Sequence, residues 1–265
     1  MPRTRGATHS IRVPHHHGEG VGQAMLPPCT IVQGGFIVSV LDVLFPKRCL
    51  GCGKIGNYFC AGCRREIHHI PHNEAICPVC ERAAIDGVTH PKCRTRYSLD
   101  GLTSFFRYDG VIRKGVKALK YHYVSDLGAE FVSLIPVAAV RDLVGHVDND
   151  RTLVPIPLHA VRLKERGFNQ AEVLGKVLVM RLHMPMRTDM LRRTKKTIPQ
   201  VEMKKREDRL KNMEAVFSVD RYVSLRGAGI ILFDDVFTTG ATMRSAANVL
   251  KRHGATYVWA VTMAR

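Results

Sequence analysis

The chain has 265 residues, 45% of them hydrophobic and 24% charged, which supplies enough apolar material for a core and excludes a wholly disordered protein. No run approaches the roughly 18 consecutive apolar residues of a membrane-spanning helix, and no apolar block follows the first charges as in a secretory signal, so we expect a cytoplasmic protein without a membrane span. Lys and Arg number 40 against 23 Asp and Glu, a net charge of +17 that favours anionic partners such as nucleic acid, phosphorylated metabolites or acidic lipid.

The first part of the chain divides into an extension and a small module. Residues 1–35 are rich in Gly, Pro and Ser/Thr without hydrophobic periodicity, which predicts a disordered extension. Residues 36–45 form an apolar stretch for which we expect a short helix, and this helix would lead into a zinc-finger module over 36–100.

Seven of the eight cysteines fall between positions 49 and 93, and most are paired two residues apart. A Cys-x-x-Cys turn directs two thiolates at one centre, and two such turns complete the tetrahedron that zinc prefers. The sequence therefore predicts a first site at Cys49, Cys52, Cys60 and Cys63. A second site has an imidazole in place of one thiolate, at Cys77, Cys80, His90 and Cys93. Four protein ligands leave no open position for water, so both sites are expected to be structural.

Two alternatives to this pairing remain open from spacing. Disulfides could join the cysteines, although the thiols of a cytoplasmic protein stay reduced. A cross-brace could combine Cys49 and Cys52 with Cys77 and Cys80. The seven-residue gap between Cys52 and Cys60 favours the sequential arrangement.

From residue 101 onward, strand-like and helix-like segments alternate, which is typical of an α/β domain with a mostly parallel sheet over 101–265. We expect strands at 102–108, 152–157, 215–219 and 229–233. Helices are expected at 111–121, 126–143 with a kink at Pro136, 203–213, and from a cap at Asn169 to about 183. Residues 158–168 are expected to form a loop. Residues 187–211 hold ten Lys or Arg against four Asp or Glu, and this run is either a solvated helix and loop or a groove for a polyanion.

The clearest chemical motif follows the strand predicted at 229–233. Asp234 and Asp235 come first, and a turn leads into a helix that begins at about residue 241. Amides of a turn and of a helix N-terminus suit a phosphate, and threonine hydroxyls add donors. Two carboxylates at a strand end can accept hydrogen bonds from sugar hydroxyls or hold Mg²⁺. The pattern therefore predicts a pocket for a phosphorylated ribose, with an ordinary strand end and turn as the alternative.

Residues 234–242 resemble the 5-phosphoribosyl-1-pyrophosphate (PRPP) motif of type I phosphoribosyltransferases. More narrowly, about residues 40–265 resemble the ComF family of late-competence proteins. The motifs that carry this likeness are the cysteine pairs, residues 119–121, 154–158 and 166–170, and Gln200 with Arg206, Arg209 and Asn212. The resemblance implies an α/β, type I phosphoribosyltransferase-like fold behind a zinc module, and a role in the uptake of transforming DNA by bacteria.

The resemblance also implies roles for individual residues. Asp234 and Asp235 would meet the ribose hydroxyls of PRPP, with Mg²⁺. Residues 154–158 would lie near the pyrophosphate, which Arg166 could neutralise, and residues 192–209 would supply a mobile cover. The 5-phosphate would be surrounded by Thr238, Thr239, Gly240, Ala241 and Thr242.

Two functions follow as hypotheses. In the first, the protein is a phosphoribosyltransferase in which Asp234, Asp235 and Arg166 assist the displacement of pyrophosphate from PRPP by an acceptor. In the second, it is a non-catalytic accessory protein that binds single-stranded DNA and keeps the PRPP pocket as a relic or regulator, with Phe168, Tyr121 and Tyr123 as stacking residues. A competence helicase is a further partner that the family likeness suggests.

Overall fold

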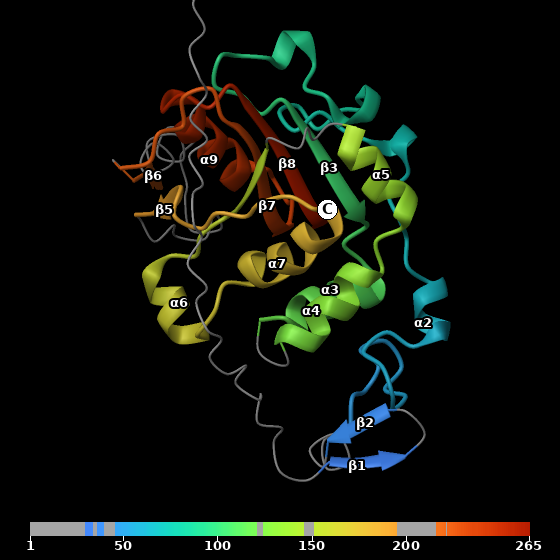
Figure 1. Ribbon diagram of the computed structural model, residues 1–265. Helices are drawn as coiled ribbons and strands as arrows, with labels where there is room; N and C mark the ends of the chain where they lie inside the picture. Colours follow the sequence, from blue (N-terminus) through green and yellow to red (C-terminus); the bar gives the residue numbers. More distant parts are fainter. Residues whose placement is uncertain are drawn as a thin grey trace, which may run out of the picture. The chain divides into compact units, whose positions relative to one another are not determined.

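The computed structural model describes residues 30–33, 36–39, 46–120, 124–145, 151–194, 216–220 and 222–265 (Figure 1). The chain divides into two compact units, Met1–Pro46 and Lys47–Arg265. The second unit therefore holds the cysteine-rich segment and the α/β sheet together.

The described part of the first unit is a β-hairpin. β1 (Thr30–Gln33) pairs with β2 (Phe36–Ser39) in antiparallel register, with Ile31 opposite Val38. The helix expected at 36–45 is therefore wrong for residues 36–39, where β-branched Ile37 and Val38 favour a strand. The other residues of that stretch, and 1–29 of the predicted extension, lie outside the described residues.

The second unit is built around a four-stranded parallel sheet in the order β3-β8-β7-β4. Its strands are β3 (Gly101–Phe106), β4 (Thr152–Pro155), β7 (Gly229–Val236) and β8 (Tyr257–Ala264) (Figure 1). The α/β class with a parallel sheet is confirmed. We did not predict β8, although its mostly apolar run shortly after a helix is the usual pattern of a strand buried on both faces.

Helices cover both faces of the sheet. Because side chains alternate along a strand, Ile231 and Phe233 face one core and Ile230 and Leu232 face the other. The first core is closed by α3 (Gly110–Ala118), α4 (Val124–Ser133), α5 (Val137–Gly145) and α7 (Gln170–Leu182). The second core is closed by α9 (Ala241–Arg252).

Two local expectations were wrong. The helix expected at 126–143 is two helices, α4 and α5, because Pro136 lies between them and has no N–H to continue the ladder. The loop expected at 158–168 contains α6 (Ala160–Arg166), which ends at Gly167 in the left-handed conformation, with φ of +81°.

A small antiparallel pair lies beside the parallel sheet. β5 (Leu191–Arg193) pairs with β6 (Phe217–Val219), the latter close to the strand expected at 215–219. The charged helix expected at 203–213 lies outside the described residues. No helix in the described part of the chain is long and apolar enough to cross a membrane.

The cysteine-rich segment has little regular structure. It contains the short helix α2 (Ala61–Arg65) and three 3-10 turns, η1 (His72–Glu74), η2 (Ile85–Gly87) and η3 (Pro91–Cys93). This segment precedes β3 and packs against the α/β domain through the contacts described below.

Candidate functional site

Eight side chains of the cysteine-rich segment gather in two groups. The first cluster is Cys49, Cys52, Cys60 and Cys63, and the second cluster is Cys77, Cys80, His90 and Cys93; within each, the potential ligand atoms lie within 4.8 Å of one another. The arrangement is sequential and not a cross-brace. The Sγ atoms of Cys52 and Cys60 are 3.6 Å apart. Sulfurs at about 2.3 Å from a tetrahedral zinc would be separated by about 3.8 Å, so the spacing fits this metal.

The two clusters begin with the same backbone turn. In the first, the N–H of Cys49 donates to Lys54 O and the N–H of Gly53 donates to Cys49 O, both at 2.8 Å. In the second, the N–H of Cys77 donates to Arg82 O and the N–H of Glu81 donates to Cys77 O, both at 2.9 Å. Gly53 and Glu81 occupy equivalent positions and both have positive φ, +80° and +61°.

Backbone N–H groups favour ionisation of one thiol in each cluster. Burial opposes ionisation of Cys49, but the N–H groups of Cys60, Cys52 and Gly51 outweigh it and lower the pKa of the thiol to about 6. Cys63 lies against the sulfur of Cys49, which raises its pKa to about 12. Four neighbouring thiols cannot all ionise by themselves, and a divalent cation removes this conflict.

The second cluster shows the same division. Burial of Cys77 is outweighed by the N–H groups of Cys80, His90 and Val79, so the pKa of its thiol is lowered. The pKa of Cys93 is raised to about 11, chiefly by its contact with Cys80. In both clusters, therefore, the first thiol has a lowered pKa and the last a raised one, although a histidine replaces one cysteine in the second cluster.

His90 is oriented as a metal ligand. Its Nδ1 lies 3.3 Å from Cys80 Sγ, and its Nε2 lies 2.9 Å from Ala83 O. A neutral ring that donates from Nε2 to this carbonyl leaves the Nδ1 lone pair directed at the three sulfurs. Metal-binding histidines are generally held by such a hydrogen bond from the other nitrogen.

The first cluster is joined to the main core. Phe59 is fully buried and stacks on Phe131 of α4, with ring centroids 5.4 Å apart. The N–H groups of Tyr58 and Phe59 donate to the two carboxylate oxygens of Glu130 at 3.0 and 2.9 Å, and Arg64 donates to the same carboxylate at 3.1 Å.

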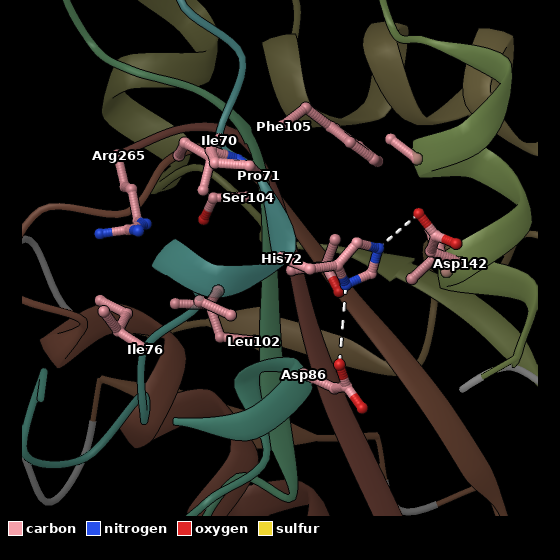
Figure 2. Close-up of a pocket in the computed structure, with 14 residues that line it drawn as sticks. Ile70, Pro71, His72, Ile76, Asp86, Leu102, Ser104, Phe105, Asp142 and Arg265 are labelled. Atoms are coloured by element: carbon pink, nitrogen blue, oxygen red, sulfur yellow. Dashed lines mark ion pairs between the residues drawn. The ribbon is translucent and has the colours of Figure 1, made fainter. Parts of the chain in front are cut away.

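The second cluster is held by charged side chains. Arg244 of α9 donates to Pro78 O at 3.0 Å and lies 3.9 Å from the carboxylate of Glu81. His72, which precedes the cluster, lies between Asp142 of α5 at 2.5 Å and Asp86 of η2 at 3.7 Å (Figure 2). His72, Asp86 and Asp142 border a small cavity of about 60 Å³ that also reaches Ser104 and Arg265 (Figure 2).

The predicted phosphate loop lies at the carboxyl edge of the parallel sheet. β7 runs three residues further than predicted, to Val236. Asp234 and Asp235 therefore lie within the last residues of the strand, where Asp234 pairs with Thr262 of β8. Thr238 and Thr239 are exposed, and the loop enters α9 at Ala241. The first turn of any helix has N–H groups with no acceptor inside the helix, and Thr238 and Thr239 come directly before the Gly240 that caps this one.

Gly240 is required by the geometry of this loop. It has a φ of +65°, and a Cβ at this position would lie 2.3 Å from the ring of Phe237 and 2.7 Å from Nη1 of Arg244. A side chain would therefore strain the backbone and displace Phe237 or Arg244. Gly240 was expected among the residues around the 5-phosphate, and the structure shows that packing against Phe237 and Arg244 also requires a glycine.

The surroundings of Asp234 oppose its ionisation. Burial and the neighbouring charge of Asp235 raise the pKa of Asp234 well above its usual range, and Arg193 opposes this shift. The N–H of Asp235 donates to Asp234 Oδ1 at 2.8 Å. Asp234 is thus fixed against the backbone, and the pair favours a cation or several hydrogen-bond donors nearby.

Residues 154–158 are held next to this acidic pair. The N–H of Ile156 donates to Phe233 O at 2.8 Å, and the side chain of Asn169 donates to Ile156 O at 3.0 Å. The same Asn169 accepts from the N–H of Ala171 and caps α7, as predicted. The motif at 166–170 therefore positions the turn that follows β4.

The cationic residues are only partly where we expected them. Arg166 is the last residue of α6 and donates to the side chain of Gln170, instead of standing in a loop. Arg193 of β5 is the arginine whose charge acts on Asp234, and Arg162 of α6 acts on Arg193. Arg193 was expected only as part of the mobile cover at 192–209. For Arg162, nothing in the sequence except its charge indicated a place near this site.

Comparisons with known proteins agree with this arrangement. Residues 40–94 match the double zinc ribbon domain. Competence protein ComFC of Bacillus subtilis (strain 168) is 31% identical over 212 residues, which cover 74% of this chain and 78% of that protein. DNA utilization protein YhgH of Escherichia coli O157:H7 is 28% identical over 201 residues, 69% of this chain and 87% of that protein. Competence protein F of Haemophilus influenzae is 26% identical over 222 residues, 79% of this chain and 93% of that protein.

Proposed function

Because the chain belongs to the ComF family of competence proteins, we propose that it takes part in DNA utilisation during natural transformation. Its two cysteine clusters serve as structural zinc sites in this proposal, with the eight side chains named above as ligands. The similarity to ComFC, YhgH and competence protein F, together with the matched double zinc ribbon, supports the assignment. The cytoplasmic location and a competence helicase as partner stay predictions.

The ligand of the α/β domain in this proposal is PRPP. The observation that carries it is the juxtaposition of Asp234 and Asp235 with a loop whose left-handed Gly240 opens α9. Ribose hydroxyls would meet the carboxylates, and the 5-phosphate would lie on the helix N-terminus among Thr238, Thr239 and Thr242. Ligands of open parallel sheets collect at this carboxyl edge.

As an enzyme, the protein would transfer the phosphoribosyl group to an acceptor while pyrophosphate departs. Mg²⁺ bound with PRPP would neutralise charge on the departing pyrophosphate, and Asp234 and Asp235 are the residues that would hold it. Arg193 acts electrostatically on Asp234, and Arg166 is hydrogen-bonded to Gln170, next to the Asn169 that holds Ile156. The main work of these residues is to orient PRPP and to stabilise negative charge.

Calorimetric titration with PRPP, with and without Mg²⁺, tests the pocket. We expect wild type to bind and Asp235→Asn to weaken binding by at least about tenfold, since a lost charge-assisted contact is worth about 1.5–3 kcal/mol. Asp109→Asn is the matched control, because Asp109 also follows a strand at the carboxyl edge but precedes α3. Unchanged affinity in Asp235→Asn would overturn the assignment of the site.

The second candidate is a non-catalytic protein that binds single-stranded DNA and uses the PRPP pocket for regulation. The excess of 17 positive charges favours it. The two candidates differ in turnover: acceptor-dependent release of pyrophosphate from PRPP, when the purified protein is given a panel of candidate acceptors, identifies the enzyme, and PRPP binding without release from any of them favours the regulator.

A further inference from the structure

The edge of the sheet opposite to Asp234 is basic. In a parallel sheet all strands begin at one edge, and here four strands lie side by side in the order β3-β8-β7-β4. The residues just before these strands include Arg96 and Tyr97 before β3, Arg252 before β8, Arg226 before β7 and Arg151 before β4. We call these residues, together with Tyr257, the amino-edge surface.

Contacts show that these residues form one continuous strip. The guanidinium groups of Arg96 and Arg252 lie 5.6 and 4.5 Å from the ring centroid of Tyr97. The N–H of Gly227 donates to Gly254 O at 3.1 Å, which brings Arg226 next to the turn that follows Arg252.

At the far side of the strip, Arg151 stacks 3.7 Å from the ring centroid of Tyr257. Tyr257 starts β8 and pairs with Gly229 at the start of β7. At least one arginine therefore precedes each strand of the sheet. The rings of Tyr97 and Tyr257 lie beside arginines of this strip.

The positive charge of this strip is not balanced locally. Asp100 is 5% exposed and is already paired with Lys251 at 2.7 Å and Arg94 at 3.2 Å. Among the described residues, no carboxylate lies within ion-pair distance of Arg96, Arg226 or Arg252, and all three are exposed. Lys251 and Arg252 lie in the last turn of α9, where the helix dipole favours positive charge. Arg96 and Arg226 lie on other segments, so this dipole does not explain their positions.

The dimensions suit a single nucleic acid strand. Four strands at a spacing of about 4.8 Å span roughly 14 Å, and a stacked strand carries one phosphate per about 3.4 Å, so about four phosphates could lie along the strip. Arg96 and Arg252, which are exposed beside the ring of Tyr97, can present N–H groups to phosphates, and aromatic side chains of this kind stack with unpaired bases. A duplex would offer its phosphates but not its base faces.

We infer that the amino-edge surface binds single-stranded nucleic acid, on the edge of the sheet opposite to the phosphate loop. This inference rests on the proposed role in DNA utilisation but not on PRPP. It separates the two sites in space, so that PRPP and a nucleic acid strand can be bound together.

Fluorescence anisotropy with a labelled thymidine oligomer of about 20 nucleotides tests this surface. The variant is Arg96→Gln/Arg226→Gln/Arg252→Gln. We expect its affinity to fall by at least about tenfold, and the slope of log affinity against log salt to fall by about 2 between about 50 and 200 mM, as three phosphate contacts are lost. PRPP affinity by calorimetry should not change.

The matched control removes the same charge from exposed residues of α2 and α3, as Arg65→Gln/Arg113→Gln/Lys117→Gln. An equal loss of affinity for the oligomer in both triple variants would overturn the assignment of this surface, because binding would then depend only on the net charge of the protein. A loss confined to Lys204→Gln/Lys205→Gln, in the basic run, would overturn it as well. Equally tight binding of a duplex or of anionic vesicles to the same surface would overturn the choice of a single strand.

Failure of the wild type to bind the oligomer would overturn the inference and the proposed DNA role, and leave the PRPP titration as a separate result. Tyr97→Leu sharpens the outcome because it keeps every charge. We expect this variant to bind more weakly with an unchanged salt slope, whereas full affinity would exclude a contribution from ring stacking.

Discussion

The two cysteine clusters share a backbone turn and differ in their surroundings. Cys49 and Cys77 begin identical turns, and N–H groups lower the pKa of both thiols. The first cluster, however, inserts Phe59 between α3 and α4, whereas the second is held through charged side chains that are only partly buried. The same metal-binding motif therefore stabilises the core in one case and attaches a peripheral segment in the other.

One contact of the second cluster reaches the predicted PRPP site. Arg244 joins Pro78, between two ligands of the second cluster, to the first turn of α9. Its Nη1 lies 2.7 Å from the point where a Cβ of Gly240 would stand. Arg244 thus links the second cluster to the loop before α9, although 166 residues separate it from Pro78.

The largest expected effect comes from loss of a zinc ligand. Cys49→Ser should destabilise the α/β domain by several kcal/mol, because structural zinc contributes about 10–16 kcal/mol of binding free energy and the seating of Phe59 depends on the cluster. Cys77→Ser should leave the sheet folded and weaken PRPP binding. Thermal denaturation and metal analysis measure these effects, with two zinc ions expected per wild-type chain and one in each variant.

Cys29→Ser is the control for these variants, since Cys29 stands outside both clusters in the sequence. It should retain two zinc ions and the wild-type melting temperature. A wild type without zinc would contradict both sites, and equal destabilisation by Cys49→Ser and Cys77→Ser would contradict the difference between them.

A smaller effect is expected at Glu130, which holds the first cluster to α4. Its side chain is 16% exposed and accepts from two backbone N–H groups and Arg64. Glu130→Gln would direct an amide N–H₂ at a donor, so we expect a loss of about 1–3 kcal/mol in the free energy of unfolding, measured by urea denaturation.

Glu172→Gln is the matched control for Glu130→Gln. Glu172 pairs with Lys176 on the exposed side of α7, and such helix pairs contribute only about 0.3–0.5 kcal/mol. An equal effect of the two substitutions would show that Glu130 does not anchor the first cluster.

Local patterns were sufficient to predict several parts of the molecule. Cysteine spacing predicted the two ligand groups that the structure brings together, and alternating patterns predicted a parallel sheet. The acidic pair and the Thr-Gly turn indicated the loop before α9. These signals lie within short windows, where periodicity and turn chemistry are informative.

Contacts between distant segments could not be predicted in this way. Glu130 meets Tyr58 across 72 residues, and Arg244 meets Pro78 across 166. A lone Glu or Arg on a helix looks the same in sequence whether it is solvated or holds another segment. Strand β8 is different, because its mostly apolar sequence is a local signal that indicates a buried strand.

The smallest expected effect is a pH dependence of the second cluster's attachment. Asp142 raises the pKa of His72, with burial opposing the shift and Asp86 adding to it. A raised folded-state pKa means that the stabilisation is complete below the unfolded value of about 6.5 and is lost as the pH rises through the folded value. Because His72 is 57% exposed, we expect less than about 1 kcal/mol.

Urea denaturation of wild type and His72→Gln at several pH values isolates this contribution. Protonation of the zinc-binding thiols also changes stability with pH, but it does so in both proteins and cancels in their difference. The difference should be largest in mildly acidic solution and vanish in alkaline solution. A difference that grows with pH would mean that the neutral ring holds the segment, as a hydrogen-bond donor to Asp142 and not as an ion-pair partner.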